Sequence, residues 1–182
     1  MGNYWDDYTD IDANSDGIWD NPNSIYSDWD YHPLKEPWEN YFPPEKYTFD
    51  TGRPKNPYPS IMGTHKGEIK PSCNITVSKL YTYPCPGTGG HTEYVKIWND
   101  TWAGKEAHWS GYQHDWHNIT FDEPFTLFAK RTYHYEIITG SYPQIIHKPE
   151  HTALDGSYIN CTSFIDANGK TYTDWIPAIR IE

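Results

Sequence analysis

The sequence predicts an all-β protein: an antiparallel β-sandwich of jelly-roll-like form, preceded by an irregular segment rich in Asp, Pro and Tyr. From residue 61 onward, short segments rich in β-branched and aromatic residues follow one another, and turn sequences separate them. No segment carries an apolar period of 3.6 residues over a useful length, so we expect no helix. Before residue 57 neither a strand period nor a helix period is present, and this sets the first segment apart.

Two domains are therefore predicted, residues 1–56 and residues 57–182. The proline-rich stretch 43–60 is typical of a linker, which we expect to end near Pro59. Residues 1–56 hold 12 acidic and 4 basic side chains, a net charge of −8, whereas residues 57–182 hold 13 and 10, a net charge of −3. The first domain therefore favours cations, and the second has an ordinary surface charge.

Seven or eight short strands in about 120 residues are typical of an antiparallel sandwich. Turn sequences between them are residues 86–90, Asp122–Pro124 and Asn168-Gly169, the last a strong signal for a two-residue hairpin. The segments predicted as strands are 74–83, 92–99, 117–121, 124–129, 132–140, 142–147, 157–165 and 170–181.

The stretch DIDANSDGIWD, residues 10–20, places oxygen-bearing side chains at alternate positions around a glycine. This order matches the start of a calcium loop, in which alternate side chains converge on the ion and the glycine takes the tight bend. Asn23 replaces the final glutamate of an EF-hand and no helical pattern flanks the loop, so we predict a short Ca²⁺ loop outside that context. The alternative is an Asx-rich turn without metal. The predicted ligands are Asp12, Asn14, Asp16, the Ile18 carbonyl and Asp20, with Asp10 as a candidate sixth.

Three features predict an extracellular, cell-surface location: the calcium loop, the glycosylation sequons and cysteines that allow one disulfide. Calcium loops of millimolar affinity belong outside cells. Four glycosylation sequons occur, at Asn74, Asn99, Asn118 and Asn160.

Two classes of function are not expected. No apolar run approaches 18 residues, so no transmembrane helix is expected. The net charge of −11 argues against nucleic acid as a partner.

The three cysteines allow one disulfide. In the strand 157–165, Cys161 faces the core if Asn160 faces solvent, because neighbouring side chains point to opposite sides. Cys85 lies between two prolines at the end of a strand. We predict a Cys85–Cys161 disulfide with Cys73 free, and the alternative is three reduced cysteines.

The N-terminal sequence GNYWDDYTDIDANSDGIWDNPNSIYSDWDYHPL, residues 2–34, resembles the tail of NosD-like proteins, which are right-handed parallel β-helices of archaeal and bacterial envelopes. Ile18-Trp19-Asp20 replaces the usual Ile-Gly-Asp and keeps the carboxylate. The solenoid itself is absent, so the resemblance implies a C-terminal piece. The second block, with LYTYPCPGTGGHTEYV and DWIPAIRI, is similar to a module appended to such proteins in archaeal surface polypeptides. The family label "copper-binding" belongs to the solenoid and is not expected to transfer.

The segment from Trp98 to Trp116 is rich in aromatic residues and histidines. We predict one long ordered loop that leaves the strand 92–99 and returns at 117–121. It should present at least one tryptophan beside a histidine and so form a binding or assembly surface. Rings exposed on a loop can stack on the apolar faces of sugars. The alternative is that half of the rings belong to the core and the rest pack on glycans or on a neighbouring module. The residues predicted to bind ligand are Trp102, Trp109, Trp116, His114 and His117.

No catalytic pattern is present: nothing pairs two carboxylates, and no nucleophile elbow or phosphate loop occurs. We expect a non-catalytic, extracellular, calcium-stabilised module of a cell-surface protein, which binds carbohydrate or scaffolds the envelope beside a neighbouring surface protein. One alternative is a self-assembling subunit, a homo-polymer such as a sheath, S-layer or filament. Another is a Cu²⁺ or Zn²⁺ site at His108, His114, His117 and Asp115, whose spacing matches no established motif.

Overall fold

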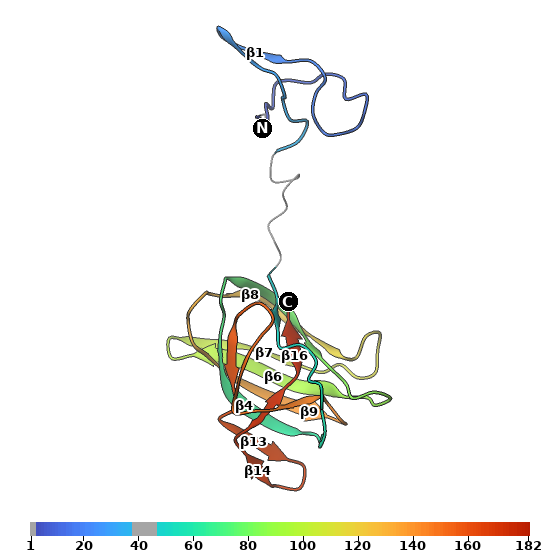
Figure 1. Cartoon of the computed structure of the whole chain (residues 1–182), viewed down its shortest axis with the longest axis vertical. Coiled ribbons are helices and arrows are strands. Elements are labelled where there is room, and N and C mark those ends of the chain that lie inside the picture. The colour runs from blue at the N-terminus through green and yellow to red at the C-terminus, as the bar shows by residue number, and fades with distance from the viewer. Residues whose placement is uncertain (1–2, 38–46) are drawn as a thin grey trace. The chain divides into compact units, whose positions relative to one another are not determined.

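The computed structural model describes residues 3–37 and 47–182, and the chain divides into two units, Met1–Glu45 and Lys46–Glu182. The described residues contain strands, turns and bends but no helix, as predicted (Figure 1). The division falls earlier than the predicted boundary after residue 56. Residues 49–56 belong to the second unit because β3 (Phe49–Asp50) pairs with a C-terminal strand and buries Phe49 completely.

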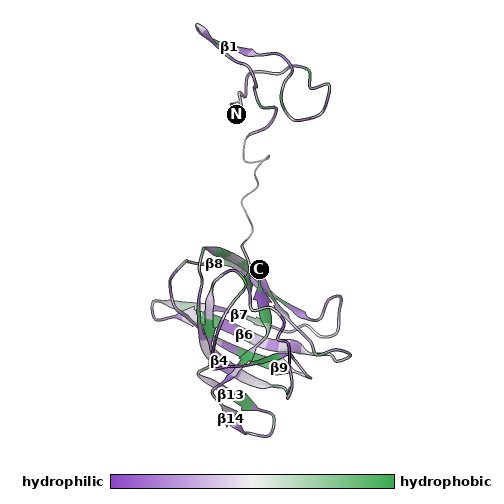
Figure 2. Cartoon of the chain, viewed as in Figure 1, coloured by the Kyte–Doolittle hydropathy of each residue, from purple (hydrophilic) through white to green (hydrophobic). Residues whose placement is uncertain are grey.

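The first unit has little secondary structure. β1 (Asn23–Ile25) and β2 (Asp28–Asp30) form an antiparallel hairpin. Isolated bridges join Leu34 to Tyr4 and to Ile18. Within residues 3–37, Leu34 is the only hydrophobic residue in the buried core. The trace of this unit is accordingly mostly hydrophilic (Figure 2).

The larger sheet of the second unit has eight strands. Its continuous path runs β11-β12-β4-β9-β6-β7, while β13 pairs with both β4 and β14, and every pairing is antiparallel. The strands are β4 (Gly63–Lys70), β6 (His91–Asn99), β7 (Trp102–His108), β9 (Tyr133–Gly140), β11 (Glu150–Thr152), β12 (Tyr158–Asn160), β13 (Ser163–Asp166) and β14 (Thr171–Tyr172).

The smaller sheet has four strands in the order β3-β16-β5-β8, and β10 and β15 form a separate antiparallel pair. Side chains alternate between buried and more exposed along the long strands, as the pleat requires. One hydrophobic cluster contains residues from both sheets, so the unit is β-sandwich-like, as predicted, while the jelly-roll strand order stays a prediction. The remaining strands are β5 (Ile75–Thr82), β8 (Asn118–Leu127), β10 (Ile145–His147), β15 (Trp175–Pro177) and β16 (Ile179–Ile181).

The prediction of one long loop between residues 98 and 116 is wrong. β6 and β7 form a hairpin in which Asn99 pairs with Trp102, and Asp100 and Thr101 make the turn. The Asn99 side chain fixes this turn, because its Oδ1 accepts hydrogen bonds from both the backbone N–H and the hydroxyl of Thr101, each at 3.1 Å. Gly104, with φ of +94°, lies inside β7 rather than ending a strand. Only residues 109–117 form the connection to β8.

Asp122–Pro124 is not a turn either. β8 is one strand through this region, and it pairs with β5 on both sides of a register shift. A proline is tolerated at such an irregularity because no ladder hydrogen bond is required there. Similarly, the predicted strand 157–165 is divided into β12 and β13, both of which pair with β4.

The predicted Cys85–Cys161 disulfide is not formed: all three cysteines are free thiols. The two thiols of the predicted pair lie in different surroundings. Cys85 follows β5, and its Sγ lies 3.6 Å from the Pro143 carbonyl oxygen. Cys161 follows β12, and its backbone N–H donates to the Pro149 carbonyl oxygen. Burial raises the pKa of the Cys161 thiol, so this group is kept in its unreactive protonated form.

Candidate functional site

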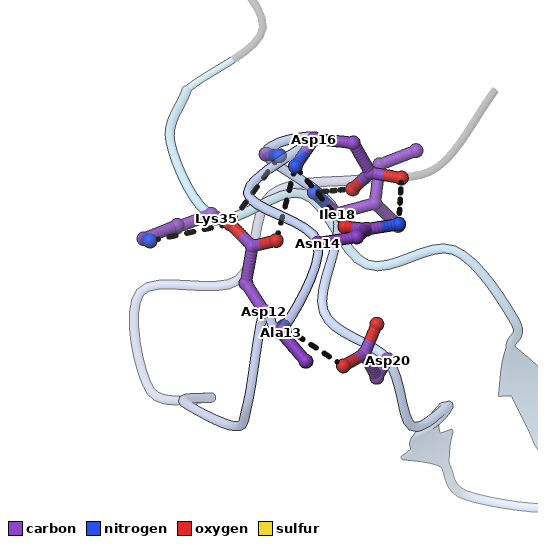
Figure 3. Close-up of polar contacts among 8 residues, drawn as sticks. Asp12, Ala13, Asn14, Asp16, Ile18, Asp20 and Lys35 are labelled. Atoms are coloured by element: carbon purple, nitrogen blue, oxygen red, sulfur yellow. Dashed lines mark hydrogen bonds and ion pairs between the residues drawn. The ribbon is translucent and has the colours of Figure 1, made fainter.

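The Asp-rich loop of the first unit brings three of its predicted ligands together. The backbone N–H of Asp16 points at two side-chain oxygens at once, Oδ1 of Asp12 and Oδ1 of Asn14, each at 3.1 Å (Figure 3). Asp16 itself lies beside Asn14, whose Nδ2 donates to its Oδ2 at 2.9 Å. Gly17 takes the tight bend with φ of +85°, as the motif predicts. Asp12, Asn14 and Asp16 therefore cluster on the inside of one curl of the chain.

A cation already lies at this cluster. Nζ of Lys35 is 3.2 Å from Oδ2 of Asp12, whose side chain is only 3% exposed. Burial alone would raise the pKa of the Asp12 carboxyl, but hydrogen bonds from Lys35, Gly17 and Asp16 hold this pKa below its ordinary value. Asp12 is therefore ionised at neutral pH and attracts positive charge.

Of the other predicted ligands, Asp20 and Asp10 have partners outside this cluster, whereas Ile18 contacts it through its backbone N–H. Oδ2 of Asp20 accepts a hydrogen bond from the Ala13 N–H at 3.0 Å, away from Asn14 and Asp16 (Figure 3). The backbone N–H of Ile18 donates to Oδ1 of Asp16 at 2.9 Å. Asp10 accepts from the Asn21 N–H and the Tyr8 hydroxyl. In residues 3–37 and 47–182, no three His, Cys, Asp or Glu side chains converge to hold one metal ion.

The chemistry of the cluster nevertheless fits Ca²⁺. Its donors are carboxylate and amide oxygens, which this hard ion prefers, and Asp12 is ionised and almost completely shielded from solvent. Each of these oxygens now accepts a hydrogen bond from an N–H of the same loop or from Lys35. Asp12, Asn14 and Asp16 are the residues that would hold the ion.

A cleft in the second unit lies beside the turn of the β6–β7 hairpin. It has a volume of about 510 Å³, within the range of small-ligand sites. Trp102 is half-buried at this cleft, with its ring centroid 5.4 Å from that of Phe125 and 6.2 Å from that of Tyr133. The lining residues are Asn99, Thr101, Trp102, Lys105, Phe125, Thr126, Phe128, Arg131 and Tyr133.

Polar groups surround these rings. The Arg131 guanidinium lies 5.0 Å from the centre of the Phe128 ring, and Phe128 is 46% exposed. Lys105 forms an ion pair with Glu123 at 2.7 Å. Aromatic faces next to amide, hydroxyl and cationic donors are a suitable environment for a ligand that is apolar on one side and polar at its edge.

The other predicted aromatic residues form a second, more tightly packed group in residues 109–117. Trp109 stacks on the buried His91 with ring centroids 4.0 Å apart, and its indole N–H donates to the Trp116 carbonyl oxygen at 3.1 Å. Tyr112 contacts Trp109 and Trp116 edge-on. Trp109 and Trp116 are half-buried. Their rings therefore stabilise the connection by packing, and offer a ligand little exposed surface.

The two predicted histidines of this connection differ. His117 lies beside Trp116, with centroids 5.1 Å apart, and its Nδ1 is 2.7 Å from the Gly90 carbonyl oxygen. His114 is exposed and has a left-handed backbone, with φ of +51°. His108 contacts the ring of Tyr94 on β6. The three histidines therefore have different neighbours, and among the described residues they do not form a metal cluster.

The side-chain amides of three sequon asparagines make different hydrogen bonds. Asn74 is exposed, and its Oδ1 accepts a hydrogen bond from the Ala129 N–H. Oδ1 of the half-buried Asn160 accepts from the Glu68 N–H. Asn118 differs because its Nδ2 donates to Oδ2 of Asp115 at 2.6 Å, and its Oδ1 is buried without a partner in the part of the chain that the structure describes.

We predict that glycan occupancy will be high at Asn74 and low at Asn118 when the chain is produced in a host that modifies N-x-S/T sequons. A glycan attaches through Nδ2, and at Asn118 this nitrogen lies 2.6 Å from Oδ2 of Asp115, which restricts access to it. Mass spectrometry of glycopeptides measures both occupancies. Asp115→Ala should raise the occupancy of Asn118, and full occupancy of Asn118 in the wild type would contradict this prediction.

Comparison of the chain with protein-family models, curated proteins and solved structures finds no match. The resemblance of residues 2–34 to NosD-like proteins therefore stays a prediction. No helix in the described residues is long and apolar enough to cross a membrane.

Proposed function

We propose that the chain is a non-catalytic, extracellular module of a cell-surface protein that binds carbohydrate at the Trp102 cleft and is stabilised by Ca²⁺ in its first unit. The observation that carries the binding function is the composition of the cleft. Four aromatic side chains and five polar or charged ones line a volume of about 510 Å³.

Sugars suit this environment because one face of a pyranose ring carries C–H groups while its edge carries hydroxyls. The C–H face packs against Trp102 or the exposed Phe128. The hydroxyls pair with Thr101, Lys105 and Arg131, so few polar groups of the ligand lose their hydrogen bonds on binding. The volume is large enough for one or two sugar rings.

Calcium supports the first unit for a different reason. Domains of fewer than about 70 residues often add a disulfide, a metal or an oligomeric partner, because they bury little apolar surface, and the first unit spans only Met1–Glu45. All the cysteines lie beyond residue 56, and Leu34 is the only buried hydrophobic residue within residues 3–37. A metal at Asp12, Asn14 and Asp16 provides the stabilisation that this small core lacks.

Association with a neighbouring protein surface is a second candidate function, favoured by the aromatic residues of the first unit. Tyr26, at the tip of the β1–β2 hairpin, is fully exposed, and Trp29 and Tyr31 are 51% and 65% exposed. Exposed aromatic residues close together in the chain are typical of protein contact surfaces.

The carbohydrate function is tested by a glycan array followed by calorimetry with the best-bound glycan. Replacement of Trp102 by Ala should weaken binding about tenfold, which corresponds to about 1.4 kcal/mol, because the stacking surface is lost. Trp102 also contacts the core, so Arg131→Ala serves as a second variant, since Arg131 is exposed at the cleft. Measurements are made on variants that keep the wild-type circular dichroism spectrum.

The matched control is Trp29→Ala, which removes an indole from the other unit. This variant should bind glycan normally. If it instead reduces self-association in analytical ultracentrifugation, the hairpin serves the second function. The carbohydrate function is contradicted if no glycan binds to the wild type, or if the two cleft variants bind as tightly as the wild type.

A further inference from the structure

A second cavity of the sandwich unit, of about 470 Å³, lies between the segment after β3 and the strands β10 and β11. Most of its walls come from two parts of the chain that are about 95 residues apart, 51–56 and 146–151. The lining residues are Thr51, Arg53, Pro54, Lys55, Asn56, Ile146, His147, Lys148 and His151. We call this cavity the basic pocket.

The charge of the basic pocket is opposite to that of the whole chain. Arg53, Lys55 and Lys148 line it together with two imidazoles, and no Asp or Glu is among the lining residues. The net charge of the chain is −11. Within residues 3–37 and 47–182, no carboxylate lies within ion-pair distance of Arg53, Lys55 or Lys148. Three cations that have no carboxylate partner among the described residues therefore line one hollow of the second unit.

Two carboxylates that neighbour lining residues in the sequence, those of Asp50 and Glu150, already have other partners. Both carboxylate oxygens of Asp50 accept from the Tyr83 hydroxyl at 3.0 Å, and one also accepts from the Gly52 N–H. Glu150 borders an adjacent hollow and accepts from the Tyr158 hydroxyl at 3.1 Å. Neither of them is a lining residue of the basic pocket.

The backbone of the pocket is held in place. The buried Thr51 exchanges hydrogen bonds with Ile179 of β16, at 2.8 and 3.0 Å, and Nε2 of His151 lies 2.9 Å from the Thr51 carbonyl oxygen. The His147 ring packs edge-on against Trp175 with centroids 4.7 Å apart. Nε2 of His147 is buried without a hydrogen-bond partner among the described residues. An acceptor oxygen brought in beside this ring would offset the cost of that burial.

We propose that the basic pocket binds a small ligand through an oxyanion group: a carboxylate, as in a uronic acid, or a sulfate or phosphate. Arg53 provides a planar fork of donors that pairs with two oxygens of such a group, and Lys148 and Lys55 add positive charge without a required geometry. This site is separate from the Trp102 cleft, with which it shares no lining residue, and does not rest on the proposed function.

The test uses the full chain and titrates it separately with glucuronate, inorganic sulfate, inorganic phosphate and neutral glucose, with amide chemical shifts as the readout. Shifts should be confined to residues 51–56 and 146–151 for at least one anion and absent for glucose. Lys148→Ala and Arg53→Ala should each lower the affinity for this anion about tenfold. The matched control Lys170→Ala removes one charge from the β13–β14 turn and should leave the affinity unchanged.

The anion that binds most tightly identifies the class of the natural ligand. Tightest binding of glucuronate indicates a carboxylate ligand, and tightest binding of sulfate or phosphate indicates an ester of that acid. The proposal is overturned if no anion shifts these residues, if glucose shifts them equally, or if Lys170→Ala weakens binding as much as Lys148→Ala. Both lysines are exposed, so loss of folding does not complicate this comparison.

Discussion

Acidification from pH 7 to pH 4 should lower the free energy of unfolding of the second unit by about 3 kcal/mol through His65 alone. His65 lies on β4 and is fully buried, stacked on Phe164 with centroids 4.2 Å apart. Its Nδ1 is 3.1 Å from the Trp175 carbonyl oxygen, and its Nε2 has no partner in the described residues. Burial lowers the pKa of His65 from 6.5 to about 3, and the hydrogen bond to Trp175 opposes this only in part.

The direction follows from which state binds the proton. Between about pH 3 and pH 6.5 the unfolded chain carries the His65 proton and the folded chain does not, so stability rises with pH through this window and levels off above it. Urea unfolding followed by tryptophan fluorescence at several pH values measures the slope. Histidine and carboxylate titrations elsewhere add to the wild-type profile, so the His65 part is obtained by difference.

Replacement of His65 by Gln removes the titrating group. The free energy of unfolding should then fall by about 3 kcal/mol less than in the wild type between pH 7 and pH 4, although the variant is less stable at pH 7. The matched control is His108→Gln, which removes an exposed histidine and should leave the profile as in the wild type. Parallel profiles for the wild type and His65→Gln would show that His65 does not carry the effect.

His65 also shows where the sequence becomes uninformative about the fold. β5 and β9 are recognisable because large β-branched and aromatic residues alternate along them. β4 escapes recognition because two of its inward positions are His65 and Gly67. Gly67 is required there because a Cβ would overlap the Asn160 carbonyl oxygen, and that contact exists only after β12 has folded against β4. Such a strand is specified by tertiary contacts rather than by its own pattern.

The same distinction applies to the sites. The cluster of Asp12, Asn14 and Asp16 is predictable because ligands within a few residues converge whenever the chain curls, whereas Asp20 is held by a separate hydrogen bond to Ala13. The basic pocket has no sequence signal. Arg53 and Lys55 lie in a stretch typical of a linker, and Lys148 joins them only because the β3–β16 and β10–β15 pairings bring distant segments together.

Chelation of calcium should unfold the first unit and leave the melting of the second unit unchanged. An ion that binds only the folded state stabilises it by about 2.7 kcal/mol at a hundredfold excess over its Kd. That is a large share of the stability of a unit whose one buried hydrophobic residue, within residues 3–37, is Leu34. Amide spectra with millimolar Ca²⁺ and with EDTA measure the effect: dispersed signals of residues 3–37 should collapse in EDTA, while those of the sandwich stay in place.

Variants separate a bound ion from general charge screening. Asp12→Asn and Asp16→Asn should abolish the difference between Ca²⁺ and EDTA, whereas Asp7→Asn, which removes the same charge outside the loop, should keep it. Lys35→Ala should strengthen the calcium effect, because the Lys35 ammonium competes for the Asp12 carboxylate from 3.2 Å away. If the first unit is equally ordered in Ca²⁺ and in EDTA, the loop is an Asx-rich turn that Lys35 alone neutralises. A calcium site would depend on the residues that cluster around the Asp16 N–H. If Asp7→Asn abolishes the difference between Ca²⁺ and EDTA as Asp12→Asn does, that difference arises from net charge and not from a bound ion.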